Sequence, residues 1–242
     1  MLEKISGIIL DITPHSDRHN VVTVFSRSRG RMAFLSSAGG GKAGRMRNSR
    51  LQPLAVIDAD INFKQNAELQ KLGSFSLRHV WAGIYFHPLK AMVGLFLSEF
   101  LNRLLRASMS DEALFDYIER SLQFFDSLEE NISDFHLTFM ASLLPFMGIQ
   151  PDISEWHDGV FFDFRSGNFS EMRPSHSDYL DNADSEWIVH LCNMNFDNMK
   201  DFGLTTELRR KLLNILLHYY SIHYLGADNI KSLKIIQETL YM

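Results

Sequence analysis

The stretch VIDADINF, residues 56–63, alternates apolar and polar side chains with a period of two. Val56 or Ile57 begins the apolar set, which continues with Ala59, Ile61 and Phe63, and the polar set is Asp58, Asp60 and Asn62. This alternation is typical of a strand that has one face in a core and the other in water. The stretch therefore predicts a strand in a sheet that is covered on one side.

Four more segments of the first 78 residues predict strands. They are ISGIILDIT, VVTVF, RMAFLSS and LQKLGSFS, and the turn-forming segments PHSDRHN and SRSRG separate the first three. Five short strands that are expected to pair antiparallel in so short a segment favour a small closed barrel. The OB-fold is the leading candidate.

From residue 79 the apolar period becomes helical, with apolar side chains at steps of three and four from Leu89 to Leu104. Asp111 is a plausible N-cap of a second helix, and a third helix ends near Pro145 and Gly148. Two or three closing helices are expected, at roughly 184–194, 205–224 and 231–240. An insert at about 153–175 contains a possible hairpin, VFFDF-RSG-NF. We therefore expect an α+β protein, in which an OB-fold barrel (1–78) is followed by an all-helical domain (79–242) with a small hairpin insert.

Composition and cysteine content narrow the class of protein. Apolar residues make up 45% and charged residues 22% of the 242 residues, which is typical of a globular chain. Cys192 is the single cysteine, so no intrachain disulfide can form and a structural zinc site is not expected. We see no signal peptide, and the apolar stretches are too short for a membrane span. These features favour the reducing cytoplasm.

Charge is unevenly distributed along the chain. Residues 111–201 hold four basic and nineteen acidic residues, whereas residues 18–57 hold no acidic residue at all. The basic residues of that second segment are Arg18, Arg27, Arg29, Arg31, Lys42, Arg45, Arg47 and Arg50. Nucleic-acid phosphates are the natural partner of such a segment, because each cation that meets a phosphate releases counterions. We expect AGGGKAGRMRNSR (38–50) to be a flexible basic loop on the rim of the barrel; the alternative is a solvated loop without a ligand.

Catalytic and metal motifs are not apparent. Gly41-Lys42 resembles the end of a phosphate-binding loop, but Ala43 replaces the Ser or Thr that would bind Mg²⁺, Ser36 replaces the first glycine, and a strand is expected to follow. The ten histidines lack cysteine partners, and no nucleophile elbow occurs. We expect no enzyme activity, no metal and no cofactor. A hydrolase that uses scattered Asp, Glu and His of the helical half remains the second hypothesis.

The order of motifs resembles the RecO family of bacterial recombination mediators in DNA repair. Thr23, Phe25, Gly30 and Arg31 stand at the positions of a family motif T-x-F-(S/T)-x-x-x-G-R, and LQPL (51–54) is similar to its LQPF. ALFDYIERSLQFFDSL, FMASLLPFMGIQPDI and RRKLLNILLHYYSIHYLGADNIKS are similar to later family segments and end at Lys231 and Ser232. Many members carry a four-cysteine zinc ribbon where this chain has PDISEWHDGVFFDFRSGNFSEMRP, which contains no cysteine.

The resemblance implies a function without catalysis. A member of this family binds single- and double-stranded DNA, anneals complementary strands and acts with RecR to replace single-strand-binding protein with RecA. The eight basic residues of 18–57 would form the DNA face, in a protein of the cytoplasm that associates with the nucleoid. The alternative is an OB-fold module that binds RNA or protein and has no annealing activity.

The resemblance also implies a groove for the acidic C-terminal tail of single-strand-binding protein. Such a tail needs an apolar pocket beside positive charge. We expect the groove on the helix that begins near His87, with a cation from the third helix. The expected residues are Leu89, Lys90, Phe96, Leu97, Arg103, Arg106 and His136. The alternative is that Arg103 and Arg106 pair with neighbouring helices.

Overall fold

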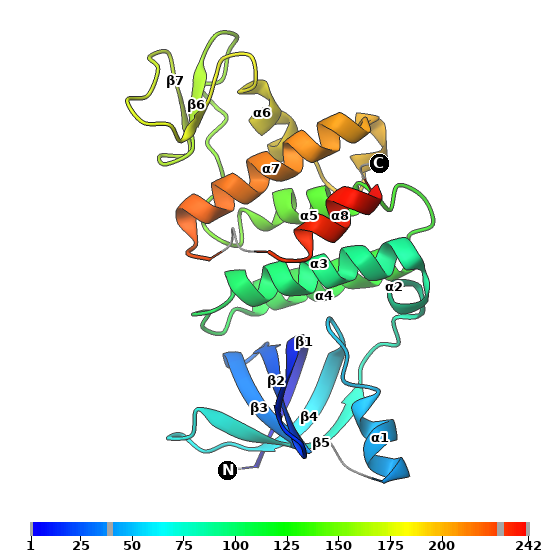
Figure 1. Ribbon diagram of the computed structural model, residues 1–242. Helices are drawn as coiled ribbons and strands as arrows, with labels where there is room; N and C mark the ends of the chain where they lie inside the picture. Colours follow the sequence, from blue (N-terminus) through cyan, green and yellow to red (C-terminus); the bar gives the residue numbers. More distant parts are fainter. Residues whose placement is uncertain (1, 38–40, 227–229, 241–242) are drawn as a thin grey trace. The chain divides into compact units, whose positions relative to one another are not determined.

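The chain folds as two compact units, Met1–Leu128 and Glu129–Met242. The computed structural model describes residues 2–37, 41–226 and 230–240 (Figure 1). Within these ranges, the first unit contains a five-stranded barrel that is followed by three helices, and the second contains four α-helices and a small sheet. The predicted domain boundary at residue 78 stays a prediction.

The barrel is closed, with strand order β1-β2-β3-β5-β4. Its strands are β1 (Leu2–Ser16), β2 (His19–Ser26), β3 (Gly30–Ser37), β4 (Val56–Asn62) and β5 (Leu69–Leu77). This confirms the predicted OB-fold barrel with five strands. Two details of the prediction were wrong. The β3–β5 pair is parallel, and β1 continues through Pro14 to Ser16, so that only Asp17 and Arg18 form the turn.

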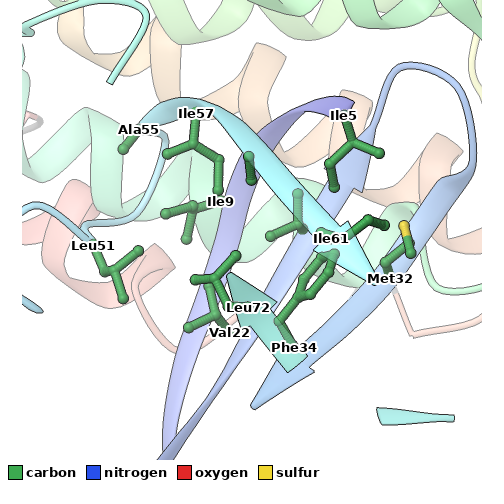
Figure 2. Close-up of a cluster of buried hydrophobic side chains, with 12 residues drawn as sticks. Ile5, Ile9, Val22, Met32, Phe34, Leu51, Ala55, Ile57, Ile61 and Leu72 are labelled. Carbon is green, nitrogen blue, oxygen red and sulfur yellow. The ribbon is translucent and has the colours of Figure 1, made fainter. Parts of the chain in front are cut away.

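The predicted alternation in residues 56–63 is confirmed by burial. Ile57, Ala59 and Ile61 lie inside the barrel, where they pack with side chains from the other four strands (Figure 2). Phe63 is partly buried against the same cluster. Burial of this apolar set stabilises the barrel by roughly 25 cal/mol for each Å² removed from water.

A short helix, α1 (Lys42–Asn48), lies between β3 and β4. The prediction of a loop in this part of the chain was therefore wrong for residues 42–48, and so was the expectation that a strand follows Gly41-Lys42. Gly39 and Gly40 lie outside the described residues. The phosphate-loop motif is still incomplete, because Ala43 and Ser36 lack the required chemistry.

Three helices complete the first unit: α2 (Ala82–Phe86), α3 (Pro88–Leu104) and α4 (Glu112–Ser127). Asp111 caps α4 as predicted, because its side chain accepts a hydrogen bond from the Leu114 backbone N–H at 2.9 Å. The outer side of the barrel packs on these helices. Ser98 Oγ of α3 donates to the Leu10 carbonyl at 2.6 Å, and the ring of Phe25 lies 6.3 Å from that of Phe115 in α4.

The second unit contains α5 (Phe135–Leu143), α6 (Glu186–Asn193), the 3₁₀ helix η1 (Met199–Phe202), α7 (Thr206–His223) and α8 (Leu233–Leu240). The three closing helices lie where the sequence predicts them. Tyr220 of α7 donates a hydrogen bond to the Met140 carbonyl of α5 at 2.8 Å, which joins the two helices in the core. None of the described helices is both long and apolar enough to cross a lipid bilayer.

The insert folds into a three-stranded sheet of order β7-β6-β8. Its strands are β6 (Phe161–Asp163), β7 (Asn168–Ser170) and β8 (Tyr179–Leu180), and the β6–β7 hairpin confirms the prediction. The buried ring of Phe162 packs against Phe169 and against Tyr219 of α7, with centroid distances of 5.0 and 5.9 Å. An apolar core of rings therefore holds the insert together.

Candidate nucleic-acid interface

The basic segment 18–57 starts in the β1–β2 turn and runs through β2, β3 and α1. All of these elements belong to the barrel's unit, and α1 lies beside β5 (Figure 1). The eight predicted DNA-binding residues fall into two groups. Four of them have intramolecular partners, and the other four lie at the β1–β2 turn or on and after α1.

Arg27 connects the β2–β3 turn to α4. Its Nε donates to Asp116 Oδ1 at 2.9 Å and its Nη2 to Asp116 Oδ2 at 3.1 Å, while Nη1 lies 2.9 Å from Glu112 Oε2. The bidentate hydrogen bond lowers the pKa of Asp116 below its ordinary value. The charge of Arg27 is thus already matched by two carboxylates.

Gly30 and Arg31 connect β3 to the segment after α3. Gly30 has a φ of +70°, and a Cβ at this position would lie 2.4 Å from the Ser108 carbonyl oxygen. The Arg31 backbone N–H donates to the same carbonyl at 3.1 Å, and its guanidinium donates to the carbonyl and the side-chain oxygen of Asn102 at 2.9 and 2.7 Å. Burial, with Arg106 nearby, lowers the pKa of Arg31. The Gly-Arg pair is therefore built into the contact between barrel and helix.

Arg29 and Arg47 also contact the barrel itself. Arg29 makes a bidentate hydrogen bond with Glu3 at 3.0 and 2.7 Å and lies 4.0 Å above the ring of Phe63. Arg47 of α1 donates to the carbonyls of Leu72 and Gly73 at 3.1 and 2.6 Å. Since both carbonyls belong to β5, Arg47 holds α1 against that strand.

The other four predicted residues are Arg18, Lys42, Arg45 and Arg50. Arg18 and Arg50 are exposed, and neither side chain makes a hydrogen bond or ion pair with any of the residues that the structure describes. Lys42 and Arg45 lie on α1, but their side chains fall outside the described part. These four residues are the cations of the segment without a described intramolecular acceptor.

Lys71 was missed as a candidate by the sequence analysis. It lies on β5, is exposed, and pairs through its backbone with Leu35 of β3. Leu35 is two residues before Ser37, which pairs with His19 next to Arg18. The alternation Gln70, Lys71, Leu72 could have indicated that Lys71 points outward from the barrel.

One hollow on the barrel offers little positive charge to phosphates. It has a volume of about 540 Å³ and is lined by β1, β4 and β5, with Asp58 and Asp60 against the single cation Lys4. Asp58 accepts hydrogen bonds from Ser6 and Arg78, and Arg78 lowers its pKa below the ordinary value. Since Asp58 is already paired with Arg78, the hollow sets one lining lysine, Lys4, against Asp60 and gives a phosphate little net attraction.

The residues predicted for a partner tail are mostly interior. Phe96 and Leu97 are fully buried in α3, and Lys90 is 4% exposed and donates from Nζ to the Asp126 carbonyl at 2.7 Å. Arg103 pairs with Glu99 of its own helix at 3.1 Å. Arg106 is exposed and Leu89 is half-buried. The tail-binding role of this helix stays a prediction.

His136 belongs to the second unit and is also interior. The imidazole is fully buried in α5, and this burial lowers its pKa to about 3. A neutral, buried ring cannot provide the cation that was expected for an acidic tail.

The insert does not offer the ligands of a zinc ribbon. It contains no cysteine, its centre is filled by the ring of Phe162, and no group of three metal-ligating side chains with suitable geometry occurs among the described residues. Cys192 of α6 is half-buried, and burial raises the pKa of its thiol to about 12. The described residues of the insert therefore do not fit a four-cysteine zinc site.

Comparison with known proteins covers nearly the whole chain. A family model described as "Recombination protein O N terminal" matches residues 1–81, and one described as "Recombination protein O C terminal" matches residues 86–234. A DNA repair protein RecO of Bacteroides fragilis is 30% identical over 239 residues, which are 98% of this chain and 99% of the relative. A DNA repair protein RecO of Phocaeicola vulgatus is 29% identical over 238 residues, which are 98% of this chain and 99% of the relative.

Proposed function

Since this chain belongs to the RecO family of DNA repair proteins, we propose that it is a recombination mediator that binds single- and double-stranded DNA and anneals complementary strands. In this proposal the chain acts by binding, without a catalytic step. It works with RecR to load RecA onto DNA that is covered by single-strand-binding protein. Its place of action is the nucleoid in the cytoplasm.

The observation that carries the DNA-binding proposal is a basic segment of forty residues without one acid, folded onto an OB barrel. OB barrels bind oligonucleotides along a positively charged groove. Arg18 and Arg50 are exposed and have no described acceptor, and α1 carries Lys42 and Arg45. The hollow on β1, β4 and β5, where a single lining lysine stands with two aspartates, supports a DNA path on the other strands.

We assign different roles to the two groups of basic residues. Arg27, Arg31 and Arg47 hold the barrel to α4, to the α3 region and to α1, respectively. The phosphate contacts fall to Arg18, Lys42, Arg45, Arg50 and Lys71. If all five meet phosphates, the logarithm of the affinity for single strands falls with the logarithm of salt with a slope of roughly −3.5, at about −0.7 for each contact.

The test is a charge reversal of Lys42, Arg45 and Arg50 to Glu, measured by fluorescence anisotropy with labelled oligonucleotides over a salt series. We expect the affinity to fall steeply and the salt slope to decrease by about 2, because three phosphate contacts are lost. The matched control reverses the charge of three exposed lysines elsewhere, Lys4, Lys64 and Lys234. Equal loss of binding in both variants would mean that overall charge, and not this surface, determines DNA binding.

Burial reduces the set of residues that a partner tail could contact on and after α3. Since Lys90, Phe96, Leu97 and His136 are interior, a tail that docks on α3 could meet Leu89, Arg103 and Arg106 at the surface. The charge of Arg106 supports this proposal, because the side chain is exposed and lies near a second cation, Arg31.

A further inference from the structure

On their outer face, the described strands β2, β3 and β5 present no exposed Phe, Tyr or Trp ring on which a nucleic-acid base could stack. Residues 1–78 contain four aromatic residues, all of them Phe. Phe25 and Phe34 are fully buried. Phe63 and Phe75 are partly buried against the barrel core, and the guanidinium groups of Arg29 and Arg47 lie 4.0 and 5.4 Å from their ring centres.

The outer face of β2, β3 and β5 is aliphatic. Its backbone register places Val21 beside Leu35 and Leu35 beside Lys71, and in the next row Thr23 beside Ala33 and Ala33 beside Leu69. All of these side chains except the exposed Lys71 are half-buried, so they form a surface that a ligand can reach. We call Val21, Thr23, Ala33, Leu35 and Leu69 the aliphatic face.

Cations border the aliphatic face. Lys71 lies at one edge of it, and Arg18 stands in the turn directly before His19, whose backbone pairs with Ser37 at the end of β3. Val21, Ala33, Leu35 and Leu69 carry no side-chain donor or acceptor, and Thr23 contributes one hydroxyl. A strand that crosses the face can therefore gain charge contacts through its phosphates but little directional contact through its bases.

We infer that the barrel holds DNA across the aliphatic face by its backbone phosphates alone and leaves the bases unstacked. This inference rests on the proposed DNA-binding function. Proteins that prefer single strands stack successive bases on aromatic side chains, which adds about fivefold or more in affinity for each base. Without such stacking, the bases of a bound strand remain available to a complementary strand, which is what an annealing protein requires.

The first experiment compares a normal single strand with an abasic strand of equal length by fluorescence anisotropy at low salt. Since both carry the same phosphates, we expect the two affinities to agree within about a factor of two. A tenfold or greater loss on the abasic strand would overturn the inference, while the proposed DNA binding would stand. Failure to bind either strand would overturn the proposed function and this inference with it.

The second experiment places a ring on the face. Leu35→Trp adds an indole beside Lys71, and Val80→Trp is the matched control, because Val80 is 76% exposed and lies outside the barrel strands. We expect Leu35→Trp alone to favour the normal over the abasic strand by about fivefold or more and to slow annealing. The same ratio in both variants would overturn the placement of the strand on this face. The abasic comparison on the unaltered protein tests the inference even if Leu35→Trp does not fold.

Discussion

Replacing Gly30 with alanine tests the contact between the β2–β3 turn and the segment after α3. The new Cβ would lie 2.4 Å from the Ser108 carbonyl oxygen and 2.5 Å from the carbonyl carbon of Met109. Both are backbone atoms, so the clash cannot be relieved by rotating a side chain. The positive φ of +70° adds strain of its own, because an L side chain rarely adopts this conformation.

The free-energy cost of Gly30→Ala is the sum of the backbone strain at positive φ and the steric overlap of the new Cβ. A non-glycine residue in the left-handed region costs about 1–2 kcal/mol, and overpacking a tight contact costs about 1–3 kcal/mol. We therefore expect Gly30→Ala to lower the free energy of unfolding of the first unit by about 2–5 kcal/mol, a large part of the 5–15 kcal/mol typical of a domain.

Two other glycines of the same unit separate the costs. Gly73 has no positive φ, but its Cβ would lie 2.2 Å from the Asp60 carbonyl oxygen, so Gly73→Ala should show the clash alone, about 1–3 kcal/mol. A Cβ added at Gly41 would meet no atom within 4 Å, and this glycine has no positive φ, so Gly41→Ala should change stability by less than about 0.5 kcal/mol.

The assay is urea unfolding followed by tryptophan fluorescence. The chain has three tryptophans, and replacing Trp156 and Trp187 with Phe leaves Trp81, which is buried in the first unit and donates to the Leu54 carbonyl at 2.9 Å. A Gly30→Ala protein that unfolds at the same urea concentration as Gly41→Ala would refute the close contact at residues 108–109.

Three further predictions concern Asp58, Cys192 and the two arginines Arg103 and Arg106. Asp58 has a pKa below its ordinary value of 3.8. Its contribution to the stability of the fold is therefore complete above pH 3.8 and is lost as the pH falls through the lower pKa of the folded state. We expect acid unfolding of the Asp58→Asn variant to depend less on pH than that of the unaltered protein. Cys192, with a thiol pKa of about 12, should react with a thiol reagent at pH 8 far more slowly than free cysteine, and rapid labelling of the folded protein would contradict its burial. The Arg103→Glu, Arg106→Glu double variant should bind a tail peptide of single-strand-binding protein more weakly in fluorescence anisotropy, and equal affinities would remove α3 from that site.

The strands and most helices could be predicted because their signals are local. The alternation around Ala59 and Ile61 and the capping residue Asp111 each depend on a few neighbouring residues. Helix α1 has no apolar period, and Arg47 holds it to β5 through carbonyls 25 and 26 positions further along the chain. No local pattern indicates such a contact, and the parallel β3–β5 pairing is equally non-local.

The candidate site shows the same limit. Charge counting found the basic segment, but it could not show which of its residues would have intramolecular partners. Arg27 pairs with an aspartate 89 positions away, and Arg31 with an asparagine 71 positions away. Lys71 was missed because it lies outside the acid-free segment, although the fold brings it beside Leu35.

The parallel β3–β5 pair has a consequence for how the barrel opens. It joins only Ala33 to Leu35 with Leu69 to Lys71, whereas β1 and β2 pair over eight positions. A short pair of strands from distant parts of the chain has few hydrogen bonds to offset the entropy of closing a long loop. We therefore expect local opening of the barrel to begin between β3 and β5. Opening would uncover two strand edges at once, and such edges can pair with those of another copy. Slow aggregation on storage should therefore begin at the β3–β5 pair, and the fastest amide exchange in the barrel strands should be found there.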